Sequence, residues 1–336
     1  MSESPKPDSR PEAPPAREPQ ILVAPSPHLS QSGFTTRRMM YDVLLGLLPV
    51  VAAALYVFGW YAVVQVGICV IACLAFEALF SSWRGRKPTL GDGSAAVTGI
   101  ILGLSLPWSA PWYVGAIASM IAIGIGKVVF GGLGQNLFNP AMVGRAFVMI
   151  CFPAALGAAA YTLPSAALKI VTQATPLTAA KQLGEPTSFL GLLLGNTNGS
   201  LGETSAIACL IGGLYLCLRR TASWEIPAGV LGSVAVISGT AYWISPGALT
   251  HPLHHLLGGA LLFGAFFIAT DPVTSPLTPK GKFLFGAGLG VFVMLIRLAS
   301  GYPEGVMFAV LLMNAVVPLI NRWTIPEPVG GPVPAR

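Results

Sequence analysis

The chain has 336 residues, of which 54% are hydrophobic and only 10% are charged. So few charges exclude an ordinary soluble domain, in which about a quarter of the residues are charged. The formal net charge of +6 does not indicate nucleic-acid binding, because the Lys and Arg residues are not gathered into one basic stripe. The composition predicts an all-α polytopic membrane protein.

The chain begins with a polar, proline-rich segment, residues 1–33. Such a segment buries too little apolar surface to offset the entropy lost on ordering, and it lacks the apolar stretch of a signal peptide. We expect it to be a disordered cytoplasmic tail. Residues 326–336 form a shorter tail of the same kind, which leaves residues 34–325 as the membrane domain.

Ten apolar segments follow, each a candidate transmembrane helix. Several are shorter than the roughly 20 residues that span a bilayer, most clearly the third and the sixth. Both of these begin at a Gly-rich polar turn, which predicts broken helices around a site and hints at an internal repeat. The segments are approximately 43–58, 62–80, 94–106, 112–130, 141–160, 206–218, 225–245, 254–269, 283–298 and 304–320.

Positive charges lie before the first apolar segment and after the second, sixth, eighth and tenth. The positive-inside rule places these flanks in the cytoplasm and, with ten segments, both termini as well. A long loop, 161–205, then lies on the outer side, and Thr204 ends it. The residues used are Arg37, Arg38, Arg84, Arg86, Lys87, Arg219, Arg220, Lys280, Lys282 and Arg322.

Two motifs on the predicted inner side place a polar residue before proline. Asn139-Pro140 and Asp271-Pro272 both suit a helix start, with Asn or Asp as the N-cap and Pro in the first turn. A polar site is the alternative, because Arg145 and Asp271 are ionisable residues at or near membrane depth, where they are costly unless paired or functional. Both interpretations stay open from the sequence.

Four acidic residues are candidates for ion coupling in the membrane: Glu77, Asp92, Glu203 and Asp271. Each is also able to cap a helix or to pair with a neighbouring arginine. For Glu77, the sequence favours an interfacial ion pair with Arg84 over an ion relay.

The cysteines form no iron–sulfur or zinc signature. All five cysteines lie within apolar runs. Cys69 and Cys73 share one helix face, and we interpret them as small apolar residues of that face. Three of the four histidines, His251, His254 and His255, sit at a predicted outer-surface helix start, where capping and interfacial hydrogen bonding are favoured over a metal or haem cluster.

The segment 199–205, Gly-Ser-Leu-Gly-Glu-Thr-Ser, precedes the sixth apolar run. Small neighbours leave the Thr204 hydroxyl accessible to a modifying enzyme, and the free backbone N–H groups of a helix start are able to hold a phosphate. The alternative is an ordinary helix start with a Ser or Thr cap.

This segment resembles the flavin-attachment motif of one membrane family, which comprises the D subunit of the Rnf electron-transport complex and the B subunit of the sodium-translocating NADH:quinone oxidoreductase. Segments 94–107, 138–147 and 270–276 are similar to further marker segments of that family, in the same order. The resemblance covers most of residues 34–325. The short extension before the first helix fits the Rnf protein better than its quinone-reductase counterpart.

The resemblance implies an FMN whose phosphate is ester-linked to Thr204, with Gly202, Glu203 and Ser205 beside it. It also implies a second, non-covalent flavin, riboflavin, for which the loops 131–145 and 270–276 are the expected location. We therefore take Asn139, Arg145 and Asp271 as candidate cofactor-binding residues.

The implied function is that of a flavoprotein subunit of an ion-translocating ferredoxin:NAD oxidoreductase in the bacterial inner membrane. The chain has no dinucleotide fingerprint and no cysteine cluster, so we expect ferredoxin and NAD to be reached only through other subunits. We expect the chain to be inactive alone and surrounded by membrane lipid. A solute channel or transporter is the alternative, because broken helices suit that class equally.

Overall fold

The computed structural model describes residues 35–85, 90–156, 177, 188–195, 197, 199–203, 205–245, 251–300 and 304–326. Thr204 lies outside the described residues, as do the predicted tail 1–33, residues 327–336 of the second predicted tail and most of the loop 161–205. The chain divides into Met1–Thr35 and Thr36–Arg336, and the second unit contains all the helices named below.

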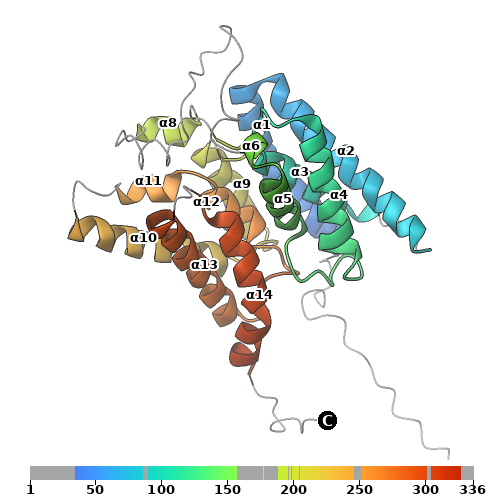
Figure 1. Ribbon diagram of the computed structural model, residues 1–336. Coiled ribbons are helices and arrows are strands. Elements are labelled where there is room, and N and C mark those ends of the chain that lie inside the picture. Colours follow the sequence, from blue (N-terminus) through green and yellow to red (C-terminus); the bar gives the residue numbers. More distant parts are fainter. Residues whose placement is uncertain are drawn as a thin grey trace, which may run out of the picture. The chain divides into compact units, whose positions relative to one another are not determined.

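Five helices are long and apolar enough to cross a membrane: α1 (Thr36–Phe58), α2 (Trp60–Trp83), α10 (Glu225–Ile244), α13 (Pro279–Ala299) and α14 (Val306–Thr324). An α-helix satisfies its backbone hydrogen bonds internally, which lipid demands of any spanning segment. In Figure 1, α13 and α14 run side by side, and α2 lies along α3 and α4. The prediction of an all-α polytopic membrane protein is confirmed.

Four apolar helices are much shorter: α3 (Ser94–Ser105), α4 (Trp112–Ile123), α5 (Pro140–Cys151) and α9 (Ala206–Leu218). At 1.5 Å per residue they are about 18–20 Å long, less than the roughly 30 Å of a hydrocarbon core. Non-helical backbone at such depth has to be enclosed by protein or to line a cavity. The predicted short third and sixth segments are therefore confirmed as α3 and α9, and α4 continues into a π-helical turn, η2 (Gly124–Val128).

The eighth apolar segment, predicted as one helix over 254–269, is broken, so that prediction is wrong. It consists of α11 (Pro252–Leu257), α12 (Leu261–Phe263) and a second π-helical turn, η4 (Gly264–Ile268). The break falls at Gly258 and Gly259, where Gly259 has a φ of +68°, a conformation suited to glycine. Arg297 of α13 donates hydrogen bonds to the carbonyls of His255 and Gly258, which supplies the end of α11 with partners.

The fifth segment also ends earlier than the predicted 141–160. Helix α5 stops at Cys151, and one turn of helix, α6 (Pro153–Leu156), follows. Proline has no N–H to donate to the preceding turn, so Pro153 is a physical reason for the stop. Residues 157–160 lie outside the described residues.

Glycines allow the helices to approach closely. A Cβ atom on Gly99 or Gly103 of α3 would lie 2.6 Å or 2.8 Å from a Cα atom of α2. A Cβ atom on Gly286 of α13 would overlap the carbonyl oxygen of Ile226 in α10. Small residues at such contacts are typical of membrane helix packing, where dispersion replaces the hydrophobic effect as the force between helices.

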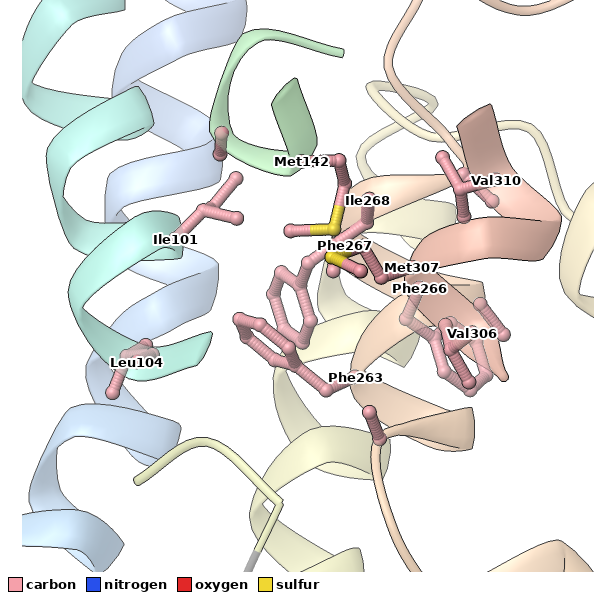
Figure 2. Packing of buried hydrophobic residues seen from close by; sticks show 14 of the residues in the cluster. Ile101, Leu104, Met142, Phe263, Phe266, Phe267, Ile268, Val306, Met307 and Val310 are labelled. Atoms are coloured by element: carbon pink, nitrogen blue, oxygen red, sulfur yellow. The ribbon is translucent and has the colours of Figure 1, made fainter. Parts of the chain in front are cut away.

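An apolar layer lies between the two ends of the domain. Figure 2 shows Phe263 and Phe267, of α12 and η4, below Met142 of α5, with Leu104 of α3 on one side of them and Phe266 of η4 on the other. All five side chains are buried, and the ring centroids of Phe263 and Phe267 are 5.5 Å apart. These side chains belong to the main hydrophobic core of the domain.

Candidate functional site

A cavity forms where several short elements begin or end. Its lining includes the starts of α3 and α5, the end of α9 and the segments that follow η2 and η4. The cavity volume is about 70 Å³, smaller than the roughly 300–1,000 Å³ typical of small-molecule sites. The polar residues among its lining are Ser94, Thr98, Lys127, Asn136, Asn139, Thr221, Thr270 and Asp271.

Asn139 confirms the predicted N-cap and also joins three elements. Its Oδ1 accepts hydrogen bonds from the backbone N–H groups of Ala141 (3.1 Å) and Met142 (3.3 Å) at the start of α5. Its Nδ2 donates to the carbonyl of Ile268 in η4 (3.3 Å), and its backbone N–H donates to Oδ1 of Asn314 in α14 (3.1 Å). Both Oδ1 and Nδ2 of Asn139 therefore help to hold the cavity wall.

Asp271 does not start a helix, so the helix-entry interpretation is wrong for this residue. The next helix, α13, begins at Pro279 and is capped by Thr278. Asp271 instead closes a local turn, in which Oδ1 accepts from Val273 N (3.1 Å) and Oδ2 accepts from the Thr274 hydroxyl (3.3 Å). Burial raises the pKa of this carboxyl above its ordinary value, although both hydrogen bonds act in the opposite direction.

A buried ion pair stands at the cavity wall. Lys127 of η2 donates from Nζ to Oε1 of Glu77 in α2 and to Oγ of Ser94 at the start of α3, both at 2.6 Å. The side chains of Lys127 and Glu77 are only 3% and 2% exposed. The predicted pairing of Glu77 with Arg84 is therefore wrong.

The geometry of α2 explains this correction. Arg84 follows Glu77 by seven residues, about 10 Å along the helix axis, and its guanidinium donates to the carbonyl of Val128. Our reading of the sequence missed Lys127. The available signal was a single lysine inside the long apolar run 112–130, because a membrane-embedded charge requires a partner.

Asn136 presents a buried acceptor at the cavity. Its Nδ2 donates to the carbonyl of Phe138 (3.3 Å), while its Oδ1 has no hydrogen-bond partner among the described residues. Leaving a buried acceptor without a donor costs about 1–3 kcal/mol, so the arrangement suits a bound molecule that carries an N–H group.

The turn 199–203 forms a second candidate site, at the other end of α9. The backbone N–H of Leu201 donates to the carbonyl of Leu106 (3.2 Å), and that of Gly202 donates to the carbonyl of Leu104 (2.7 Å). A Cβ atom on Gly202 would lie 3.1 Å from the Cβ of Leu104, so this close approach favours glycine. The turn that leads to Thr204 is thereby fixed to the end of α3.

Ser205 is the N-cap of α9. Its hydroxyl accepts from the backbone N–H of Ala208 (3.3 Å) and donates to the carbonyl of Leu193 (3.2 Å) in α8 (Phe189–Leu194). The predicted helix start at residue 206 is confirmed, and the capping role belongs to Ser205. Its hydroxyl is engaged both as donor and as acceptor.

Arg145 lies at this second site and not at the cavity, which corrects its grouping with Asn139 and Asp271. Its Nη2 is 3.6 Å from Oε1 of Glu203 and 3.7 Å from Oε2 of Glu304. Helix α5 carries Arg145 six residues, or about 9 Å, beyond Asn139. Glu304 and the buried Arg297 are charged residues near this site that the sequence interpretation did not single out.

The three histidines occupy different environments. His251 caps α11, as expected, and its Nδ1 accepts from the N–H of Leu253 (3.3 Å). His254 and His255 are buried, so their predicted surface position is wrong. Helix α11 is covered on this side by Phe189 of α8, whose ring centroid is 4.5 Å from that of His254.

Comparison with known proteins shows the family. The model of the NQR2, RnfD, RnfE family matches residues 22–330, which is most of the chain. The chain belongs to the NQR2, RnfD, RnfE family. Membership in the NQR2, RnfD, RnfE family confirms the resemblance found in the four sequence segments, and it establishes a multi-pass membrane protein.

Individual members of the NQR2, RnfD, RnfE family are similar over nearly their whole length. The chain is 42% identical to the D subunit of the Na⁺-translocating ferredoxin:NAD⁺ oxidoreductase complex of Acetobacterium woodii, over 90% of this chain and 93% of the relative. It is 39% identical to the D subunit of the proton-translocating ferredoxin:NAD⁺ oxidoreductase complex of Clostridium ljungdahlii, over 92% and 96%. It is 41% identical to the D subunit of the ion-translocating oxidoreductase complex of Stutzerimonas stutzeri, over 87% and 92%.

Proposed function

We propose that this chain is the flavin-carrying D subunit of an ion-translocating ferredoxin:NAD oxidoreductase complex in the bacterial inner membrane. Relatives named as D subunits of Na⁺-translocating or proton-translocating ferredoxin:NAD⁺ oxidoreductase complexes share about two-fifths of their residues with the chain. The observation that carries the proposal is that α9 connects two candidate sites. The fixed turn before Thr204 lies at its start, and the cavity lies at its end, about 20 Å away along the helix. Other subunits supply the contacts with ferredoxin and NAD.

Thr204 is the proposed attachment point for FMN, through a phosphoester. The hydroxyl of the neighbouring Ser205 is already used twice, in capping α9 and in bonding to Leu193, which leaves Thr204 as the better acceptor. A helix N-terminus favours a phosphate, and Arg145 adds positive charge nearby. A bound flavin supplies one- and two-electron steps, while the protein fixes its position and its electrostatic surroundings.

The cavity is the proposed site of the second flavin, riboflavin. A flavin ring carries an imide N–H between two carbonyl groups, and the Oδ1 of Asn136 offers a buried acceptor for such a donor. Lys127 brings positive charge to the cavity, and Asp271 brings a carboxyl whose pKa burial raises. Apolar side chains such as Met39, Val97 and Phe267 complete the lining, and the cavity has to widen from about 70 Å³ to admit a flavin ring.

The cavity end of the domain is proposed to face the cytoplasm. Arg219 pairs with Asp42 at 3.2 Å, and Lys282 donates to the Ser223 hydroxyl at 2.6 Å, so basic residues gather at this end. The end of α14 lies there too, because the Thr278 hydroxyl donates to that of Thr324 (2.7 Å). The positive-inside rule gives this end a cytoplasmic location, with the turn before Thr204 on the outer side.

This orientation predicts the result of reporter fusions. A fusion after Arg336 gives cytoplasmic reporter activity, because an even number of predicted membrane crossings precedes Arg336. A fusion near Gly184 gives external activity, because an odd number of crossings precedes Gly184. Alkaline phosphatase and a cytoplasmic fluorescent reporter measure the two outcomes. External activity from a fusion at Lys87 would contradict the ten-segment topology.

The two-flavin proposal predicts what denaturation of the purified complex releases. This subunit remains fluorescent on a denaturing gel, with its mass raised by one FMN less one water, while a phosphate-free flavin appears in the supernatant. The alternative, a solute transporter, is favoured by the cavity between broken helices. A subunit without flavin that moved a small solute in liposomes would establish that alternative instead.

A further inference from the structure

Two carboxyl groups meet beside the turn that leads to Thr204. The side chains of Glu203 and Glu304 are 4% and 19% exposed, and both lie within 4 Å of one guanidinium nitrogen of Arg145. Neither distance, 3.6 Å or 3.7 Å, is short enough for a hydrogen bond. The Oε1 atoms of both glutamates have no hydrogen-bond donor in the part of the chain that the structure describes.

The second guanidinium nearby is directed to the backbone. Arg297 donates from Nη1 to the carbonyl of His255 (2.5 Å) and from Nη2 to that of Gly258 (3.1 Å). A Cβ atom on Gly259 would lie 3.0 Å from Oε1 of Glu304 and 3.2 Å from Nη2 of Arg297, so glycine permits the approach of these two groups. The cluster therefore contains two arginines, but Nη1 and Nη2 of Arg297 bind carbonyl oxygens.

The other titratable groups around the pair are few. Helix α11 contributes His254 and His255, and α9 contributes Cys209, whose thiol donates to the carbonyl of Gly202 (3.4 Å). None of these is an anion at neutral pH in its ordinary state. The balance between the two carboxyls and the two arginines consequently sets the charge of the cluster.

Two carboxylates in contact repel each other, and a proton on one of them removes the repulsion and supplies the missing donor. Burial, followed by the charge of Glu203 and a hydrogen bond with it, raises the pKa of Glu304 well above its ordinary value, although Arg145 and Arg297 act in the opposite direction. Two carboxyl groups that share one proton titrate together, as a pair.

We propose that Glu203 and Glu304 form a proton-binding site that holds one shared proton when the flavin on Thr204 is reduced and releases it when that flavin is oxidised. This inference rests on the function proposed above, which places the flavin one residue from Glu203. One electron arrives from the ferredoxin-dependent chain of the complex, and one proton from water forms an O–H bond with a carboxylate oxygen of the pair. When the electron leaves for the next carrier, that O–H bond breaks and the proton returns to water.

The size of the effect follows from Coulomb's law. An added negative charge about 10 Å away, at an effective dielectric constant of about 20, raises the proton affinity of the pair roughly tenfold. The midpoint pH of the pair therefore moves up by about one unit on reduction of the flavin.

Infrared difference spectroscopy of the purified complex tests the proposal, because the C=O stretch of a protonated carboxyl is distinct from the bands of a carboxylate and shifts in D₂O. The band is recorded from acid to alkaline pH, in the oxidised sample and after reduction with dithionite. We expect the carboxyl band of the pair, which is distinct from that of Asp271, to disappear at a single midpoint, about one unit higher in the reduced sample. Glu203→Gln and Glu304→Gln each remove this titration, because the remaining carboxylate no longer faces a like charge and pairs with Arg145.

Three control variants separate the contributions. Asp271→Asn removes only the band of the carboxyl at the cavity, and Glu225→Gln, at the start of α10, leaves the titration of the pair unchanged. Thr204→Ala keeps the titration of the pair but loses its shift on reduction. Glutamine preserves the shape of glutamate, and co-purification of the other subunits shows that each variant is assembled.

The possible outcomes are distinct. If the carboxyl band that remains in Asp271→Asn also survives in both glutamine variants, the proton-binding site is overturned. A midpoint that does not move on reduction, in a wild-type subunit that fluoresces on a denaturing gel, overturns the redox linkage and leaves the proposed function standing. A wild-type subunit without fluorescence overturns the proposed function and the linkage together.

Discussion

Replacing Thr204 by alanine reduces ferredoxin-dependent NAD⁺ reduction in membranes to the background rate and removes the fluorescence of this subunit on a denaturing gel. The effect is expected to be complete because the flavin on Thr204 has no second attachment point. Ser205, the nearest other hydroxyl, donates to Leu193 and accepts from Ala208, and it is 8% exposed. The two assays, run on the same membranes, measure both losses.

Two control variants accompany Thr204→Ala. Thr204→Ser retains a hydroxyl at the same position and keeps part of the fluorescence. Ser205→Ala keeps the flavin but loses the cap of α9, at a cost of about 0.5–2 kcal/mol in stability. Full coupled activity in Thr204→Ala, or fluorescence lost only in Ser205→Ala, would place the attachment elsewhere.

The second large effect is expected for Lys127→Met. Removing the lysine leaves the carboxylate of Glu77 buried without its cation, which costs about 3–5 kcal/mol. The same change withdraws a donor from the Ser94 hydroxyl, at the start of α3 and in the cavity wall. The thermal and denaturant midpoints of the detergent-solubilised protein measure the loss of stability, and the amount of non-covalent flavin that co-purifies measures the damage to the cavity.

The double variant Lys127→Met with Glu77→Gln is the matched control. Neutralising both partners removes the uncompensated charge, so most of the stability returns. Arg84→Ala, which the sequence alone would have selected as the partner of Glu77, changes the stability by less than about 1 kcal/mol, because Arg84 is exposed at the end of α2. A larger loss for Arg84→Ala than for Lys127→Met would contradict the ion pair between Glu77 and Lys127.

Local patterns in the sequence were sufficient for the membrane class, the short third and sixth helices, the start of α9 and the cap at Asn139. Each of these depends on neighbours within a few residues: an apolar run long enough to favour a helix in lipid, or a carboxamide one residue before proline. The same reasoning was wrong at Asp271, because an Asp-Pro pair satisfies a turn as readily as a helix start, and the hydrogen bonds made by Val273 and Thr274 select the turn.

The tertiary structure alone decided how the charged residues are grouped. Glu77 and Lys127 are 50 residues apart, and which face of α2 meets η2 depends on helix packing that no local pattern encodes. Helix α5 separates Arg145 from Asn139 by about 9 Å and brings it to Glu203 and Glu304, residues far from it in sequence. Arg297 likewise meets the broken end of α11 across about 40 residues. A buried charge is stabilised by whichever opposite charge or dipole the fold places beside it, so its partner is a property of the packed helices and not of the neighbouring sequence.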